Sequence, residues 1–149
     1  MSKGNPITVR TFEDLDVYKV CRELRTQLSN LAGTFPKNEK YRLADQLIRA
    51  SRSVTANLAE GYGRFHYAEN AQYARQDRGS LYEVLDHLTV CKDEKIVDNE
   101  TFVRVRDDIV RAITIVNGFI RYLRSAKDSR ILAINDSRLT VNDLCPTMN

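Results

Sequence analysis

The fold is decided by residues 35–64, which read FPKNEKYRLADQLIRASRSVTANLAEGYGR. Pro36 closes the preceding segment, because a proline ring disfavours helix in the residue before it, and Gly61 and Gly63 supply a stop. Between these signals, apolar or small residues recur at three- and four-residue steps and share one helical face. They are Leu43, Leu47, Ala50, Val54, Leu58 and Gly61. We therefore predict one long helix over residues 38–61, with this face in the core.

Two further faces of this helix carry other kinds of side chain. A basic face bears Arg42, Asp45, Arg49 and Arg52. A face of small or short residues consists of Ala44, Ile48, Ser51, Thr55 and Ala59. A surface helix needs only one apolar and one polar face. The small face therefore predicts close contact with a helix outside the intrachain core, and hence a homo-oligomer.

Three more segments keep the helical period, over residues 14–33, 67–94 and 100–126. The links between segments are short, and no segment shows the alternation of a strand. These features predict an all-α fold, an antiparallel up-down four-helix bundle that forms one domain over residues 1–126. Gly79 falls inside the third segment, where it suggests that another backbone passes close by.

The tail, residues 127–149, has a different pattern. Its stretch ILAINDSRLTV at 131–141 predicts a non-helical tail, either a small hairpin around Asn135 and Asp136 or an extended strand that binds a partner. A mobile terminus is the plainer interpretation, and the pattern favours it.

Composition excludes several classes of protein. The 149 residues are 42% hydrophobic and carry a net charge of +3, which fits one water-exposed domain with a sizeable core. No apolar run approaches the roughly 20 residues of a membrane helix, and the first ten residues lack the apolar centre of a secretory signal. We therefore expect a cytoplasmic protein without a membrane partner. Cys21, Cys91 and Cys145 are odd in number and lack CxxC spacing, so we expect small hydrophobes rather than a disulfide or a zinc site.

Signals for catalysis are poor. His66 and His87 are not spaced as metal ligands on one helix, and no glycine-rich phosphate loop follows a strand. Inward-facing carboxylates are conceivable, but no Glu-x-x-His pair supports a di-iron bundle; the candidates are Glu60, Asp77 and Glu83. We expect no enzyme activity, no cofactor and no metal.

Two polar residues lie beside the core face of the 38–61 helix, Asn57 and Glu60. A buried polar group without a partner costs about 1–3 kcal/mol, so both should be paired, for example with Arg64 or Arg78. A structural network that fixes helix register is the favoured interpretation, and a ligand site is the alternative.

The basic residues suggest contact with phosphate. Sixteen of the 23 basic residues are arginine, whose planar fork binds two phosphate oxygens at once. The candidate nucleic-acid-binding residues are Lys37, Lys40, Arg42, Arg49, Arg52, Arg64, Arg75 and Arg78. The alternative is a solvated face with internal pairs such as Asp45–Arg49, and composition alone favours this alternative.

The sequence also resembles a known family on residues spread over three of the predicted helices. The matching features are Leu15–Asp16–Val17–Tyr18, Phe35–Pro36–Lys37, Gln46, Arg49–Ala50, Asn57, Ala59–Glu60–Gly61, Arg64, Glu69, and Gly79–Ser80 within GSLYEV at 79–84. They cover about residues 12–126. The chain resembles the four-helix-bundle proteins encoded in intervening sequences of bacterial large-subunit ribosomal RNA genes, which are related to the accessory variability proteins of diversity-generating retroelements.

This resemblance implies a basic homopentamer without enzymatic activity. For the retroelement relatives it implies binding to RNA or DNA and to a reverse transcriptase. Two residues depart from the pattern: His66 replaces an expected serine cap, and Asp77 replaces a small residue before Arg78. The second departure puts an anion site around Gly79 in doubt. The alternative function is a protein–protein interaction scaffold, in which the arginines are merely solvated.

Overall fold

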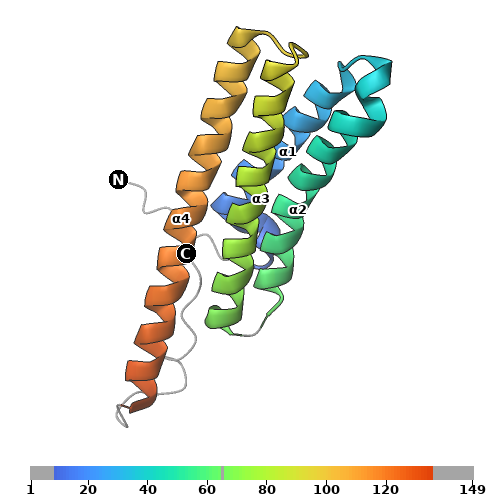
Figure 1. The fold of residues 1–149 in the computed structure, drawn as a ribbon. Coiled ribbons are helices and arrows are strands. Elements are labelled where there is room, and N and C mark those ends of the chain that lie inside the picture. Colours follow the sequence, from blue (N-terminus) through green and yellow to red (C-terminus); the bar gives the residue numbers. More distant parts are fainter. Residues whose placement is uncertain (1–8, 65, 136–149) are drawn as a thin grey trace, which may run out of the picture.

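Four long helices run alternately up and down in the structure, a computed structural model that describes residues 9–64 and 66–135, without the side chains of 40, 41 and 127–135 (Figure 1). They are α1 (Asp16–Gly33), α2 (Asp45–Tyr62), α3 (Tyr67–Asp93) and α4 (Asn99–Asn135). Within the described ranges there is no strand. The predicted all-α, up-down four-helix bundle is confirmed.

The core lies where the predicted apolar faces meet. On α2 and the turn before it, every residue of the predicted core face is buried, from Leu43 to Gly61. On α4, Val105, Ile109 and Val116 are fully buried. Cys21 and Cys91 are free and buried, as expected of small hydrophobes, whereas Cys145 lies outside the described residues. Three neighbouring pairs, α1–α2, α2–α3 and α3–α4, contact one another extensively, and α1 and α4 less so.

The entry into α2 is less regular than predicted. A 3₁₀ turn (Lys37–Glu39) and a π-helical turn (Lys40–Ala44) precede the α-helix, in place of one continuous helix from residue 38. A π turn closes its hydrogen bonds one residue further along than an α turn. The spacing of Arg42 from Arg49 and Arg52 therefore does not follow the straight α-helical period on which their shared face was predicted.

The small face of α2 packs within the chain. Ala44, Ser51 and Thr55 are buried, and the Thr55 hydroxyl accepts a hydrogen bond from Arg25 of α1. Small side chains here let α1 approach α2. The premise that this face lies outside the intrachain packing is therefore wrong, because α1 of the same chain contacts it. The homo-oligomer itself stays a prediction.

Close helix contact occurs at Gly61 and not at Gly79. A Cβ atom on Gly61 would lie 2.7 Å from both Asn70 Oδ1 and Tyr73 Cβ of α3, whereas a Cβ on Gly79 would meet nothing within 4 Å. Glycine at 61 thus permits the α2–α3 approach. The expectation of a backbone close to Gly79 is wrong for the described chain, because Gly79 lies on the outer side of α3 and is exposed.

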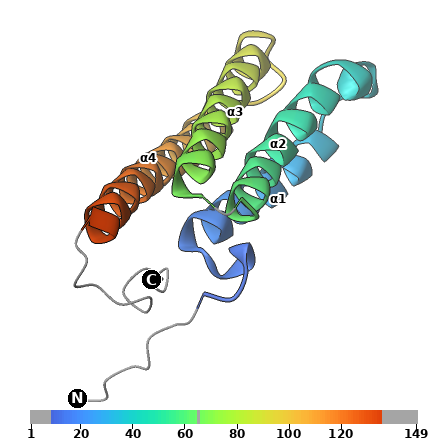
Figure 2. The same cartoon turned by 90° about the horizontal axis from the view of Figure 1, so that it is seen from below.

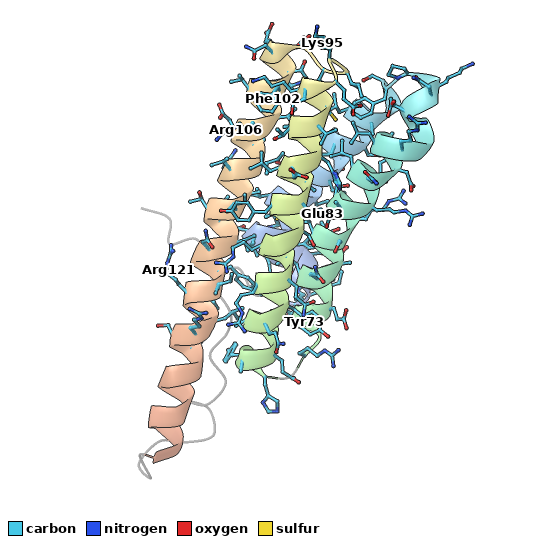
Figure 3. The ribbon with its side chains drawn as sticks, in the orientation of Figure 1. Tyr73, Glu83, Lys95, Phe102, Arg106 and Arg121 are labelled. Carbon is cyan, nitrogen blue, oxygen red and sulfur yellow. The ribbon has the colours of Figure 1, made fainter. Side chains whose placement is uncertain are left out.

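A Schellman motif ends α3. The Ile96 N–H donates to the Cys91 carbonyl at 2.8 Å, and the Lys95 N–H donates to the Lys92 carbonyl at 3.0 Å. Lys95 occupies the left-handed position of the motif, with φ 58°, where glycine is the usual residue. Figure 3 shows Lys95 in the turn that joins α3 to α4.

The fourth helix is longer than predicted. It continues to Asn135, so the non-helical tail that was predicted from residue 127 is wrong for 127–135, including the Asn135 half of the hairpin turn. No glycine or proline interrupts the sequence between Gly118 and Pro146, and the charged stretch at 127–130 broke the apolar period without breaking the helix. Residues 136–149, with Asp136, lie outside the described residues. In Figure 1 the lower end of α4 extends past the start of α3.

Candidate nucleic-acid interface

Three predicted arginines are exposed on α2 and the turn before it. Arg42 lies in the π-helical turn, and Arg49 and Arg52 lie in the first half of α2. Arg42 and Arg52 form no ion pair with any described residue. Their guanidinium groups are therefore available to an external anion.

Arg49 is partly neutralised by its own helix. Its Nε lies 2.8 Å from Asp45 Oδ2, and the two side chains are 77% and 44% exposed. An ion pair this exposed contributes about 0–1 kcal/mol to stability. The pair reduces the local positive charge but is weak enough for a phosphate to compete for Arg49.

Helix α1 adds a basic residue that the sequence analysis missed. Arg25 Nη1 donates to Thr55 Oγ1 at 2.7 Å, and Thr55 Oγ1 in turn donates to the Arg52 carbonyl at 3.3 Å. The half-buried Arg25 guanidinium therefore lies against the turn of α2 that carries Arg52. Arg22, three residues earlier and exposed, is a neighbour of Arg25 on the surface of α1 and also lines the groove toward α4. The available signal was the small face of α2, which had to receive a neighbouring helix and its long side chains.

The other predicted basic residues are dispersed. Lys37 is exposed in the 3₁₀ turn, Arg75 is exposed on α3, and the side chain of Lys40 is outside the described part. Arg78 is half-buried and donates to Asn117 Oδ1 at 3.0 Å, which links α3 to α4. Arg64 follows the opposite end of α2 from Lys37 and contacts Glu60 and Tyr73 of the same chain. The eight candidates thus do not form one patch.

Glu60 and Arg64 form a cluster with Tyr73. Arg64 Nη2 lies 2.9 Å from Glu60 Oε1 and donates to Tyr73 Oη at 2.6 Å, and Tyr73 Oη donates to Glu60 Oε1 at 2.9 Å. The guanidinium also lies over the Tyr73 ring, 5.1 Å from its centroid. The hydrogen bonds from Tyr73 and Arg64 lower the pKa of Glu60. Figure 3 shows Tyr73 near the start of α3, close to the α2–α3 turn.

Asn57 belongs to a separate cluster, without an arginine. Its Nδ2 lies 3.4 Å from both Ser53 Oγ and Ser80 Oγ, which are 3.0 Å apart. This cluster joins α2 to α3 on the half-buried margin of the core. Asn57 and Glu60 are thus both hydrogen-bonded, in two networks rather than one.

Asp77 faces the core, unlike the exposed Glu60 and Glu83. Its side chain is fully buried on α3, and neither carboxyl oxygen has a hydrogen-bond partner among the described residues. Burial raises the pKa of Asp77 to about 8, so the group is mostly protonated at neutral pH. The nearby carboxyl adds to the effect of burial in raising the pKa of the Cys21 thiol. Asp77 is therefore mostly neutral at neutral pH and buried, whereas Gly79 is exposed.

An open groove runs along the α1–α4 side, where the two helices contact each other least. Its volume is about 800 Å³, and its lining combines charged residues with apolar ones, among them Lys19, Arg22, Glu23, Arg104, Leu31 and Val105. No group of three or more His, Cys, Asp or Glu residues in the described part of the chain could hold a metal ion. None of the helices within the described residues has the length and apolar character of a membrane span.

Comparisons with known proteins place this bundle. A crystal structure from Bacteroides thetaiotaomicron, described as a protein with unknown function from the S23 ribosomal protein family, superposes with a TM-score of 0.66 at 16% identity. The match covers 70% of this chain and 95% of that chain, and it shows a shared fold. No curated protein matches significantly. The family model of the 23S rRNA-intervening sequence protein matches residues 13–118, and the chain therefore belongs to that family.

Proposed function

We propose that this protein is a non-catalytic accessory protein that assembles into homo-oligomers and binds the phosphate backbone of RNA or DNA. The observation that carries the proposal is the exposed arginine set of α2, Arg42, Arg49 and Arg52, of which two have no ion pair among the described residues. The family's description names intervening sequences of 23S rRNA, which supports RNA as the first probe.

The chemistry of the arginine set favours positioning over sequence reading. Guanidinium contacts to phosphate fix register and orientation but carry no base information. Each neutralised phosphate releases counterions, so affinity should fall steeply as salt concentration rises. We therefore expect RNA and DNA of many sequences to bind, with a strong salt dependence.

Assembly would strengthen such binding. Five copies at +3 each would carry +15, and a field of that size attracts polyanions. Exposed apolar side chains on α3 and α4 offer a contact surface between copies; they are Tyr82, Val103 and Val110. We keep the pentamer, which the resemblance implied, as part of the proposal. Light scattering tests it, and a species of only 17.1 kDa at micromolar concentration would refute the homo-oligomer.

The resemblance to retroelement accessory proteins implies a protein partner as well, a reverse transcriptase, and we include it in the proposal. Co-expression of this chain with a retroelement reverse transcriptase, followed by co-purification, tests this part separately. Failure to co-purify in low salt would remove the partner from the proposal and leave the nucleic-acid activity standing.

The test of nucleic-acid binding is a fluorescence-anisotropy titration at several salt concentrations. The variant replaces Arg42, Arg49 and Arg52 with glutamine, and the control replaces three exposed arginines of α4 in the same way; these are Arg106, Arg121 and Arg124. Both variants lose three charges. The α2 variant should bind far more weakly, with a flatter salt dependence, while its helicity and assembly match the parent.

Equal losses in the two triple variants would mean that only net charge matters and would remove the α2 site. Absence of binding by the parent, even in low salt, would favour the scaffold instead.

A further inference from the structure

We infer that the seam between α1 and α2 holds a preformed site for a nucleic-acid phosphate, built around Arg25 with Arg22 and Arg52 on either side. This inference rests on the proposed function and adds residues of α1 to the arginines of α2 as phosphate contacts. Figure 1 and Figure 2 show α1 and α2 side by side and antiparallel, so residues of both helices border one seam.

Thr55 fixes the position of the Arg25 side chain. Its hydroxyl accepts from Arg25 Nη1 at 2.7 Å and donates to the Arg52 carbonyl at 3.3 Å. Thr55 itself is buried, and its hydroxyl is held by two partners. The guanidinium is thus oriented before any ligand arrives, which lowers the entropy lost on binding.

Arg25 keeps most of its donors free. A guanidinium has five N–H donors, and Arg25 forms one hydrogen bond within the described part of the chain, to a neutral hydroxyl. A half-buried charge is usually balanced by an acid, because partial removal from water is unfavourable. No described acid forms an ion pair with Arg25. An anion from outside would supply the missing partner.

The acids near the seam are directed elsewhere. Asp45 pairs with Arg49, and Glu60 is bound by Arg64 and Tyr73 on the α3 side. Glu23 of α1 borders the groove toward α4. Arg22 lines that groove as well, but no described acid forms an ion pair with Arg22, Arg25 or Arg52.

Arg22 and Arg52 extend the site in opposite directions. Because α1 and α2 are antiparallel and Arg25 meets Thr55, Arg22 lies one turn to one side of this contact and Arg52 one turn to the other. Six residue steps at about 1.5 Å separate them, or about 9 Å along the seam. Such a row suits a chain of phosphates better than a single small anion, and arginine provides bidentate contacts along it.

Three single variants test the site by anisotropy with a labelled single-stranded RNA and a DNA of matching sequence. Arg25→Gln should weaken binding about 5- to 10-fold in low salt and reduce the salt slope by about 0.7, the value for one phosphate contact of a single strand. Thr55→Val keeps the charge of Arg25 but removes the hydroxyl that orients its guanidinium group. It should weaken binding about 2- to 3-fold with the salt slope unchanged. Arg121→Gln, on α4 away from the seam, removes one charge as a control and should change affinity less than 2-fold (Figure 3).

The outcomes separate this inference from the proposed function. If the parent binds and the α2 triple variant loses binding, but Arg25→Gln behaves like Arg121→Gln, the seam site is wrong and the proposed function stands. If the parent binds neither the RNA nor the DNA probe, both the seam site and the proposed function are refuted. A change in salt slope for Thr55→Val would also refute the positioning role, since this variant keeps every charge. Thermal melting of each variant shows that the fold is retained.

Discussion

Replacing Asp77 with asparagine should remove much of the pH dependence of this protein's stability. The carboxyl is fully buried, and its pKa is raised to about 8 by burial, against 3.8 for an ordinary aspartate. Between these two values the folded protein keeps a proton that the unfolded chain has lost. Asparagine has nearly the same shape and does not titrate in this range.

The sign follows from linkage. A group whose pKa is higher in the folded than in the unfolded state makes its full contribution to stability at pH values below the unfolded pKa. This contribution declines as the pH rises toward the folded pKa. The decline is about 1.4 kcal/mol per pH unit, or about 6 kcal/mol over the whole interval. Between pH 5 and pH 7 the parent should thus lose about 2.7 kcal/mol of unfolding free energy relative to Asp77→Asn.

Urea unfolding of both proteins at pH 5, 6 and 7, at one fixed protein concentration, measures this difference, because the contributions of all other titrating groups cancel. The Cys21 thiol nearby does not interfere, since burial raises its pKa away from this range. Asp77→Leu is a second test. Because this variant buries no polar side-chain atoms at position 77, its free energy of unfolding at pH 7 should exceed that of the parent by about 1–3 kcal/mol. Parallel pH profiles for the parent and Asp77→Asn would refute the reasoning, because they would mean that Asp77 is ionised or solvated in the folded state.

Three further predictions concern the core, the α3–α4 turn and the arginine set. Leu47→Ala and Ile109→Ala, both at fully buried positions, should each cost about 2–5 kcal/mol in urea unfolding, and unchanged midpoints would contradict the core assignment. Lys95→Gly should stabilise the fold by about 0.5–1 kcal/mol, because glycine adopts the left-handed conformation of Lys95 without strain; a lower midpoint would show that the turn tolerates lysine without cost. Asp45→Asn releases Arg49 and removes one acid from the arginine set, so RNA affinity in low salt should rise about 2- to 5-fold by anisotropy. Weaker binding would mean that Asp45 positions Arg49 rather than competing for it.

The fold could be predicted because each helix carries its own apolar period. All six residues of the predicted core face on α2 and the turn before it are buried, and the predicted start of α3 at residue 67 is correct. The end of α4 could not be predicted in this way. At residues 127–130 the apolar pattern stops while helix-permitting residues continue, so periodicity marks the end of the core and not of the helix.

The role of the small face on α2 depended on information that no single helix contains. The pattern of Ala44, Ser51 and Thr55 correctly indicates close approach of another helix, but it does not say which helix arrives. The structure places α1 of the same chain there. The same limit explains why Arg25 was missed: its importance comes from meeting Thr55, which is 30 residues away in sequence.

Asp77 and Arg25 are two ionisable side chains that have no ionic partner among the described residues, and the bundle accommodates them in different ways. Asp77 continues the three- and four-residue steps of Ala74, Leu81 and Val84, so its position alone indicates a core residue. There the carboxyl gives up its charge, because no donor offsets burial. Arg25 lies at the margin of the core, and its guanidinium cannot lose its proton in a protein. It therefore stays charged and takes a neutral hydroxyl as its partner. A mostly neutral acid in the core makes stability depend on pH, whereas a fixed cation at the margin of the core is the feature on which we base the proposed phosphate site. We therefore propose the α1–α2 seam, and not the interior of the bundle, as the place where an anion binds.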